Sequence, residues 1–95
     1  MTSTSTLVIF RVKSGKEADF EAAIDRVLKF TSHAGGLIRC DRYRDPADRQ
    51  RYVLHEIWES SQLLDEHVAS VHFVEFVEET TVLLETKEVF ILNPF

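Results

Sequence analysis

The chain is poor in the residues that build disulfides, flexible linkers and phosphate-binding loops. Its 95 residues include one cysteine, three glycines and two prolines. The single Cys40 excludes an internal disulfide framework, and we interpret it as a small apolar strand residue rather than a reactive thiol. The motifs G-x-G-x-x-G, H-E-x-x-H and C-x-x-C are missing, and so is a serine nucleophile elbow. The sequence therefore predicts no metal site and no cofactor.

The chain also lacks a surplus of positive charge and any long apolar run. It carries 11 Lys and Arg against 16 Asp and Glu, for a net charge of −5, which excludes nucleic acid as the main partner. No apolar run approaches the length of about 20 residues that crosses a membrane. Residues 1–5 are polar and lack a signal-peptide pattern, so we expect a disordered leader there. The expectation is a single cytoplasmic domain over residues 1–95 that binds no membrane.

Short β-branched and aromatic runs predict strands over residues 7–13, 37–44, 51–59 and 88–92. The S-x-x-E spacing of residues 14–17 predicts a capping box and a first helix that ends near residue 34, before Gly35 and Gly36. A second helix is expected from Ser60 or Ser61, broken by a new start at Ser70. The turn over residues 45–48 joins the second and third strands in a hairpin. The order β-α-β-β-α-β predicts an α+β, ferredoxin-like fold with a four-stranded antiparallel sheet.

Apolar residues in the helical regions recur at helical intervals and predict the faces that pack inward. In the first helix these residues are Phe20, Ala23, Ile24, Val27 and Leu28. In the second region they are Leu63, Leu64, His67 and Val68, followed after Ser70 by Phe73, Phe76, Val77, Thr80, Leu83 and Leu84.

Both faces of the expected sheet are apolar, although two helical regions can cover only one. Residues 52, 54, 56 and 58 alternate with Val53, His55 and Ile57, and the first strand opposes Leu7 and Ile9 to its even-numbered residues. Leaving one face in water would forfeit several kcal/mol, at about 25 cal/mol per Å² of apolar surface. The simplest solution is a second copy packed face to face, so the sequence predicts a homodimer.

One strand face and the broken helix carry the candidate site. Glu56 and Trp58 share strand parity, and His67 lies on the apolar stripe of the second helix. If that face meets the helices, these residues and His72 converge on one cavity. A neutral imidazole, with an ordinary pKa of about 6.5, can act as a general base, and Trp58 can offer a flat wall and an N–H donor to a planar ring. We therefore predict Glu56, Trp58 and His67 as catalytic residues.

Five further residues are candidates to contact the substrate: His72, Phe73, Tyr52, Arg39 and Tyr43. Structural roles remain open for all of them and for the catalytic candidates. Trp58 can pack in the core or in a dimer interface, and Glu56 can cap a helix or pair with a cation. His67 can be a packing residue, His72 can close a helical turn, and Arg39 can pair with a strand aspartate.

The order E-x-W-x-S over residues 56–60, followed by H-x-x-S-x-H-F over residues 67–73, resembles the small antibiotic-biosynthesis-monooxygenase domains. The likeness extends over residues 8–93 through the segments RVKSGKEADFEAAI, GLIRCDRYRDPAD, RYVLHEIWES and LLDEHVASVHF. It implies a ferredoxin-like fold that pairs into a dimeric α/β barrel. It also implies a cofactor-independent monooxygenase that oxidises a small aromatic or quinol-like molecule with O2. Trp58 and His67 match the family's strand tryptophan and helix histidine.

The resemblance leaves other activities open. Relatives of this kind include a small-molecule isomerase and proteins that only bind ligands. The haem-degrading branch fits less well, because its first-strand Asn, helix Trp and axial His correspond here to Val8, His67 and Val77. For the oxygenase, the resemblance implies that a base removes a proton from a phenolic substrate and that the resulting anion reduces oxygen directly.

Overall fold

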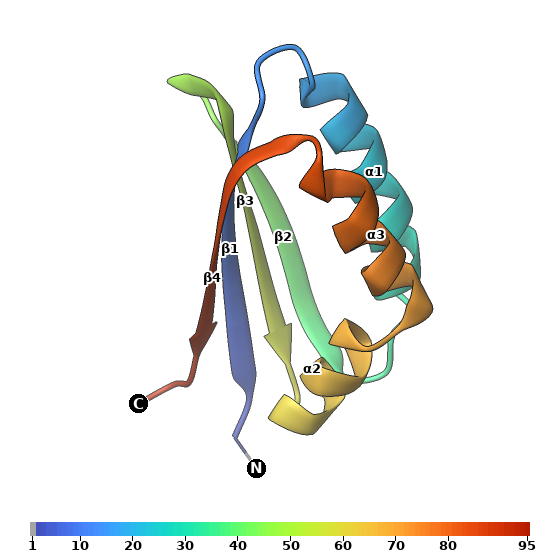
Figure 1. The fold of residues 1–95 in the computed structure, drawn as a ribbon. Helices are drawn as coiled ribbons and strands as arrows, with labels where there is room; N and C mark the ends of the chain where they lie inside the picture. Colours follow the sequence, from blue (N-terminus) through green and yellow to red (C-terminus); the bar gives the residue numbers. More distant parts are fainter. Residues whose placement is uncertain (1) are drawn as a thin grey trace.

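A computed structural model of the chain describes residues 2–95 as one sheet with helices on one of its faces (Figure 1). The strands are antiparallel and lie in the order β2-β3-β1-β4. The elements, in chain order, are β1 (Thr4–Val12), α1 (Glu17–Thr31), β2 (Leu37–Asp45), β3 (Asp48–Trp58), α2 (Ser61–Val68), α3 (Val71–Thr81) and β4 (Leu84–Leu92). The ferredoxin-like order and the break in the second helical region are confirmed. In residues 2–95, no helix combines the length and apolar character needed to cross a membrane.

The first strand begins earlier than the sequence suggested. Thr4 and Ser5, expected in a disordered leader over residues 1–5, belong to β1, while Met1 lies outside the described residues. Thr4 pairs with Trp58 across the sheet and is buried, because β1 continues beside β3 as far as the last residue of that strand. The last strand is also longer than predicted, since it begins at Leu84.

The serine caps of the broken helix are confirmed, whereas the capping box of α1 is not. Ser60 Oγ accepts a hydrogen bond from the Leu63 N–H at 3.2 Å, and Ser70 Oγ accepts one from the Phe73 N–H at 3.3 Å. Lys16 stands at the N-cap of α1 without a side-chain cap. The chain turns at Gly15, with φ of +89°, so Ser14 lies too early to reach the helix. The helix ends at Thr31, three residues before the predicted end.

The core lies between the helices and the sheet face formed by even-numbered residues of β1 and β3. Phe10, Phe20 and Tyr52 form its centre, with centroids of adjacent rings 5.0 Å apart. The inward stripes predicted for α1 and α3 are buried or partly buried, so the helical periodicity was correct over the helices themselves. Leu83 and Leu84 were wrongly placed on the second stripe, because α3 ends at Thr81 and Leu84 begins β4. Val68 is the exception: it is 45% exposed, because α2 ends there and turns away from the sheet.

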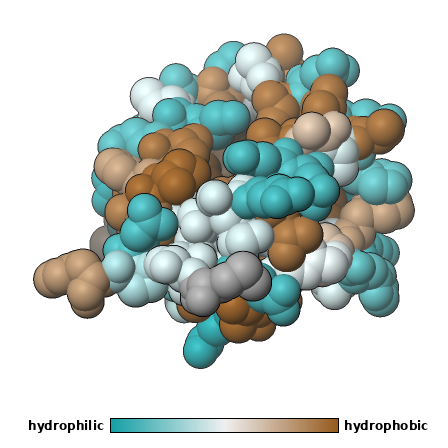
Figure 2. Space-filling view, turned by 90° about the horizontal axis from the view of Figure 1, so that it is seen from below, coloured by the Kyte–Doolittle hydropathy of each residue, from teal (hydrophilic) through white to brown (hydrophobic). Residues whose placement is uncertain are grey.

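The opposite face, which we call the outer face, has no helix over it (Figure 1). Its apolar side chains come from three strands and are Leu7, Ile9, Val53, Ile57, Phe90 and Leu92. Strand β4 lies at the sheet edge, and Val89 and Ile91 on its other face are also more than half exposed. Seen from the end where α2 and both termini lie, apolar patches alternate with polar ones (Figure 2).

The three glycines differ in backbone conformation and in the space around an added Cβ, so their alanine variants measure how closely the chain packs against α2. A Cβ at Gly36 would stand 2.5 Å from Leu63 Cδ1, and Gly36 also has φ of +93°. Gly15 shares the positive φ but has nothing within 4 Å, and Gly35 has neither constraint. We expect Gly36→Ala to lower the free energy of unfolding by about 2–4 kcal/mol, and Gly15→Ala by about 1–2 kcal/mol. Urea denaturation of both, with Gly35→Ala as the matched control, measures the difference. Equal losses for Gly36→Ala and Gly15→Ala would contradict the close contact with Leu63.

Candidate functional site

The Trp58 indole is the anchor of the candidate site. It is fully buried at the end of β3, and its Nε1–H donates to Glu56 Oε1 at 3.1 Å. The two residues are two positions apart on one strand, so both point to the helix side. Because Glu56 accepts the hydrogen bond of the indole N–H, the donor predicted for a substrate is already used. The buried indole ring supports the His67 imidazole that packs on it.

Glu56 is a buried carboxyl that forms no salt bridge within residues 2–95. It is 6% exposed and accepts a hydrogen bond from the Trp58 indole and a weak one from the Cys40 thiol, whose Sγ lies 3.8 Å from Oε2. Burial raises the pKa of Glu56 above its ordinary value, because the charged form loses its hydration. Burial and the nearby Glu56 raise the pKa of the Cys40 thiol to about 12. The thiol is therefore not a nucleophile at neutral pH, as the sequence indicated.

His67 reaches over the indole from α2. Its ring centroid is 4.7 Å from that of Trp58 and 5.1 Å from that of Phe73, so the imidazole is held between two aromatic rings. Burial lowers the pKa of His67, which keeps the imidazole neutral at pH 7. Among residues 2–95, neither ring nitrogen of His67 makes a side-chain hydrogen bond. Every fully buried side-chain nitrogen or oxygen there has a partner, so the unpaired His67 nitrogens are accessible ones. A nitrogen of His67 is thus free to accept a proton from a bound molecule.

A cavity of about 330 Å³ opens beside these two rings, between the ends of α1, α2 and α3 and the end of β3. Its volume is at the small end of the range that ligand pockets occupy. Trp58 and His67 line it from inside, and Phe30 and His72 line it as exposed residues. The remaining lining residues are Thr31, Ala34, Gly35, Leu63, Glu66 and Ser70.

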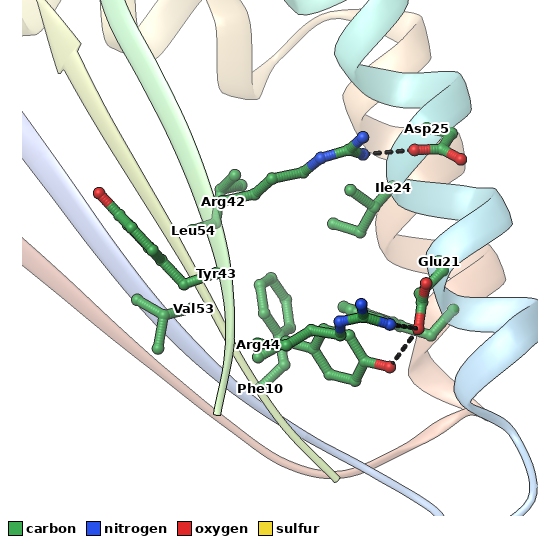
Figure 3. Close-up of a pocket in the computed structure, with 11 residues that line it drawn as sticks. Phe10, Glu21, Ile24, Asp25, Arg42, Tyr43, Arg44, Val53 and Leu54 are labelled. Carbon is green, nitrogen blue, oxygen red and sulfur yellow. Dashed lines mark hydrogen bonds and ion pairs between the residues drawn. The ribbon is translucent and has the colours of Figure 1, made fainter. Parts of the chain in front are cut away.

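A second cavity, of about 270 Å³, lies between α1 and strands β2 and β3 (Figure 3). Ion pairs from Arg42 to Asp25 and from Arg44 to Glu21 cross it, and the Tyr52 hydroxyl donates to Glu21 at 2.6 Å. Burial and this hydrogen bond raise the pKa of Tyr52 to about 12. These acids, the two arginines and the tyrosine are already partnered with one another, so the cavity offers no poised base. The first cavity is therefore the stronger candidate for a functional site.

Five of the predicted site residues gather around the first cavity: Glu56, Trp58, His67, His72 and Phe73. Three do not. Tyr52 belongs to the second cavity. Arg39 is exposed and donates to Asp41 at 2.5 Å, the strand pairing that was the alternative for it. Tyr43 is 54% exposed and points away from the helices (Figure 3).

Phe30 is the aromatic lining residue that the sequence analysis did not predict. It stacks on His72 with ring centroids 3.5 Å apart and an interplanar angle of 8°. Its only signal in the sequence was a large apolar residue outside the buried stripe of α1, just before the Gly35–Gly36 pair. The stack also shows that His72 contacts a ring on another helix.

A comparison of the sequence with protein-family models matches residues 6–79 to the antibiotic biosynthesis monooxygenase family. The chain belongs to this family. The match begins within β1, ends within α3 and includes every residue that lines the first cavity. A search of curated proteins found no match.

Solved structures of the same fold come from several microorganisms. A conserved protein from Methanosarcina mazei Go1 is 22% identical, with a TM-score of 0.95 over 100% of this chain and 95% of that one. A putative antibiotic biosynthesis monooxygenase from Nitrosomonas europaea is 20% identical, with a TM-score of 0.92 over 98% and 90%. SnoaB, a cofactor-independent oxygenase from Streptomyces nogalater, is 21% identical, with a TM-score of 0.88 over 97% and 92%. At these identities the structures show the shared fold.

The buried Glu56 makes a prediction for the pH dependence of stability. Because its pKa is raised in the folded chain, the folded state holds this proton at pH values where the unfolded state has lost it. Its contribution to stability is complete below the unfolded pKa and is lost as pH rises through the folded pKa. Glu56→Gln removes the titration, so the free energy of unfolding of the variant should gain on that of the wild type as pH rises.

Urea denaturation between about pH 4 and pH 8 measures this difference. Glu75→Gln, at an exposed position of α3, is the matched control and should show no such divergence. A constant difference between Glu56→Gln and wild type across that range would contradict a buried, proton-holding Glu56.

Proposed function

We propose that this protein is a cofactor-independent monooxygenase that oxidises a small aromatic, quinol-like molecule with O2 in the 330 Å³ cavity. The observation that carries the proposal is the position of the His67 imidazole, which lines the cavity, packs on Trp58 and has no side-chain hydrogen-bond partner among residues 2–95. Burial also lowers the pKa of His67, which favours the neutral imidazole that a base requires. Membership of the monooxygenase family supports it, and so does the fold shared with SnoaB, a cofactor-independent oxygenase.

The chemistry needs little more than a base and a shielded ring. His67 accepts the proton of a phenolic hydroxyl while the substrate ring lies in the cavity beside the imidazole, and the resulting anion is electron-rich enough to reduce O2 directly. At a ring CH2 activated in this way, one oxygen atom becomes a C=O oxygen. The other oxygen atom leaves as water and carries away both hydrogens of the CH2 group. The four electrons that the carbon loses thus reduce one O2. The apolar rings exclude water, which strengthens each electrostatic contact of the anion.

Removal of the base tests the proposal. Oxygen uptake with a panel of naphthoquinols and anthrones, corrected for spontaneous oxidation, should fall by about 10²- to 10⁴-fold in His67→Ala, the usual contribution of a general base. His33→Ala, which removes an exposed histidine at the end of α1, is the matched control and should keep the wild-type rate. Unchanged uptake in His67→Ala would remove His67 from the mechanism.

Oxygen itself is the second variable. The proposed reaction consumes one O2 for each molecule of substrate, so turnover should stop in anaerobic buffer and resume when air is admitted. Turnover that persists without oxygen would replace the monooxygenase with an isomerase that uses the same base.

The proposal includes a homodimer formed through the outer face. Leu7, Ile9, Val53 and Ile57 form an apolar surface there that one chain leaves without a helix, and a second copy related by a two-fold axis would cover it with the same residues. Sedimentation equilibrium should therefore give twice the mass of one chain.

Ile9→Asp places an unpaired carboxylate in that interface and should weaken association by more than about 100-fold, since burying an unpaired charge costs several kcal/mol. Val82→Asp, at a position 67% exposed after α3, should leave the dimer intact. A wild-type protein that sediments as one chain at high concentration would contradict this arrangement.

A further inference from the structure

Phe30 and His72 form a second aromatic pair at the open side of the cavity. Phe30 lies in the last turn of α1 and is 51% exposed, and His72 is an exposed residue in the first turn of α3. Their rings are stacked in nearly parallel planes, with centroids 3.5 Å apart. Both line the cavity whose inner wall is Trp58 and His67. Because Trp58 is fully buried and the pair is exposed, the pair lies at the mouth.

The position of Phe30 is not explained by core packing. The buried residues of α1 are Phe20, Ala23, Ile24, Val27 and Thr31, and Phe30 stands outside that stripe. The Arg26–Glu79 ion pair already joins α1 to α3 one turn of α1 away. A half-exposed phenylalanine ordered against a histidine ring therefore extends the aromatic lining of the cavity outward, toward solvent.

We propose that Phe30 and His72 are the outer, specificity-determining half of the ligand site. His67, which packs on the buried Trp58, binds the ring that reacts, and the outer pair contacts the additional fused rings of a polycyclic phenol. The inference rests on the proposed function of this cavity, because it takes the phenolic ring at His67 as given. A one-ring phenol occupies the inner half alone, whereas a ligand with two or three fused rings reaches the mouth.

A series of phenols of increasing ring number tests this in anaerobic buffer, where no oxygen is present to support turnover. Calorimetric titration of phenol, 2-naphthol and 9-phenanthrol should show wild-type affinity that rises with each added ring. In Phe30→Ala and His72→Ala, phenol should bind as it does to the wild type. The affinity for 9-phenanthrol should fall by about threefold to tenfold, as expected for the loss of one aromatic contact. His72→Phe, which keeps the stack, should restore it.

Val74→Ala is the matched control, because it shortens an exposed apolar side chain of α3 that does not line the cavity. An equal loss for all three phenols in Phe30→Ala and His72→Ala would mean that the pair only holds the helices together, and it would overturn the inference. Unchanged affinity for every phenol, or wild-type affinity that does not rise with ring number, would overturn it as well.

The same titrations separate this inference from the proposed function. Ring-dependent binding that is lost in the variants, combined with no oxygen uptake by the wild type, would support the outer half-site and refute the monooxygenase. Oxygen uptake that depends on His67, combined with variants that bind every phenol as the wild type does, would support the monooxygenase and refute the outer half-site.

Discussion

The buried indole of Trp58 requires a hydrogen-bond acceptor for its N–H. The arrangement of the site depends on the acceptor that β3 supplies. Glu56, two residues earlier on the same strand face, supplies the acceptor and is buried with it. The bond fixes the plane of the indole beneath α2, where His67 packs on it. A buried carboxyl is a costly partner unless it holds its proton, and the raised pKa of Glu56 shows the environment that favours this. Both ionisable groups of the site are therefore biased toward their neutral forms.

The parts of the site that the sequence predicted are those set by local rules. Strand periodicity of two placed Glu56 and Trp58 on one face, and the structure shows that this face is the one that meets the helices. Serine side chains at positions 60 and 70 fixed the starts of α2 and α3 within one residue. These starts set the angle at which His67 crosses the indole. The order of elements and the ferredoxin-like fold followed from the same local signals.

The parts that the sequence did not predict depend on distance and register. Tyr52 shares the face of Trp58 but lies six residues away, about 20 Å along an extended strand, so it belongs to another cavity. Strand β2 is polar along both faces, and its register against β3 shifts between Leu37 and Arg39, which no alternation of residues revealed. Phe30 was not predicted because it lies outside the apolar stripe of its helix. Only the packing of α3 against α1 brings His72 into contact with it.

The proposed site depends on a ring-sized space beside His67, which packs on the buried Trp58, and the chain's single tryptophan makes occupancy of that space observable. Fluorescence of Trp58, titrated with a hydroxyanthraquinone that absorbs at the emission wavelength, reports on a ligand bound close to the indole. The account predicts saturable quenching that reaches completion at one ligand for each chain and that a non-absorbing phenol reverses by competition. Quenching that rises linearly with ligand concentration, with the slope found for free tryptophan in solution, would contradict it.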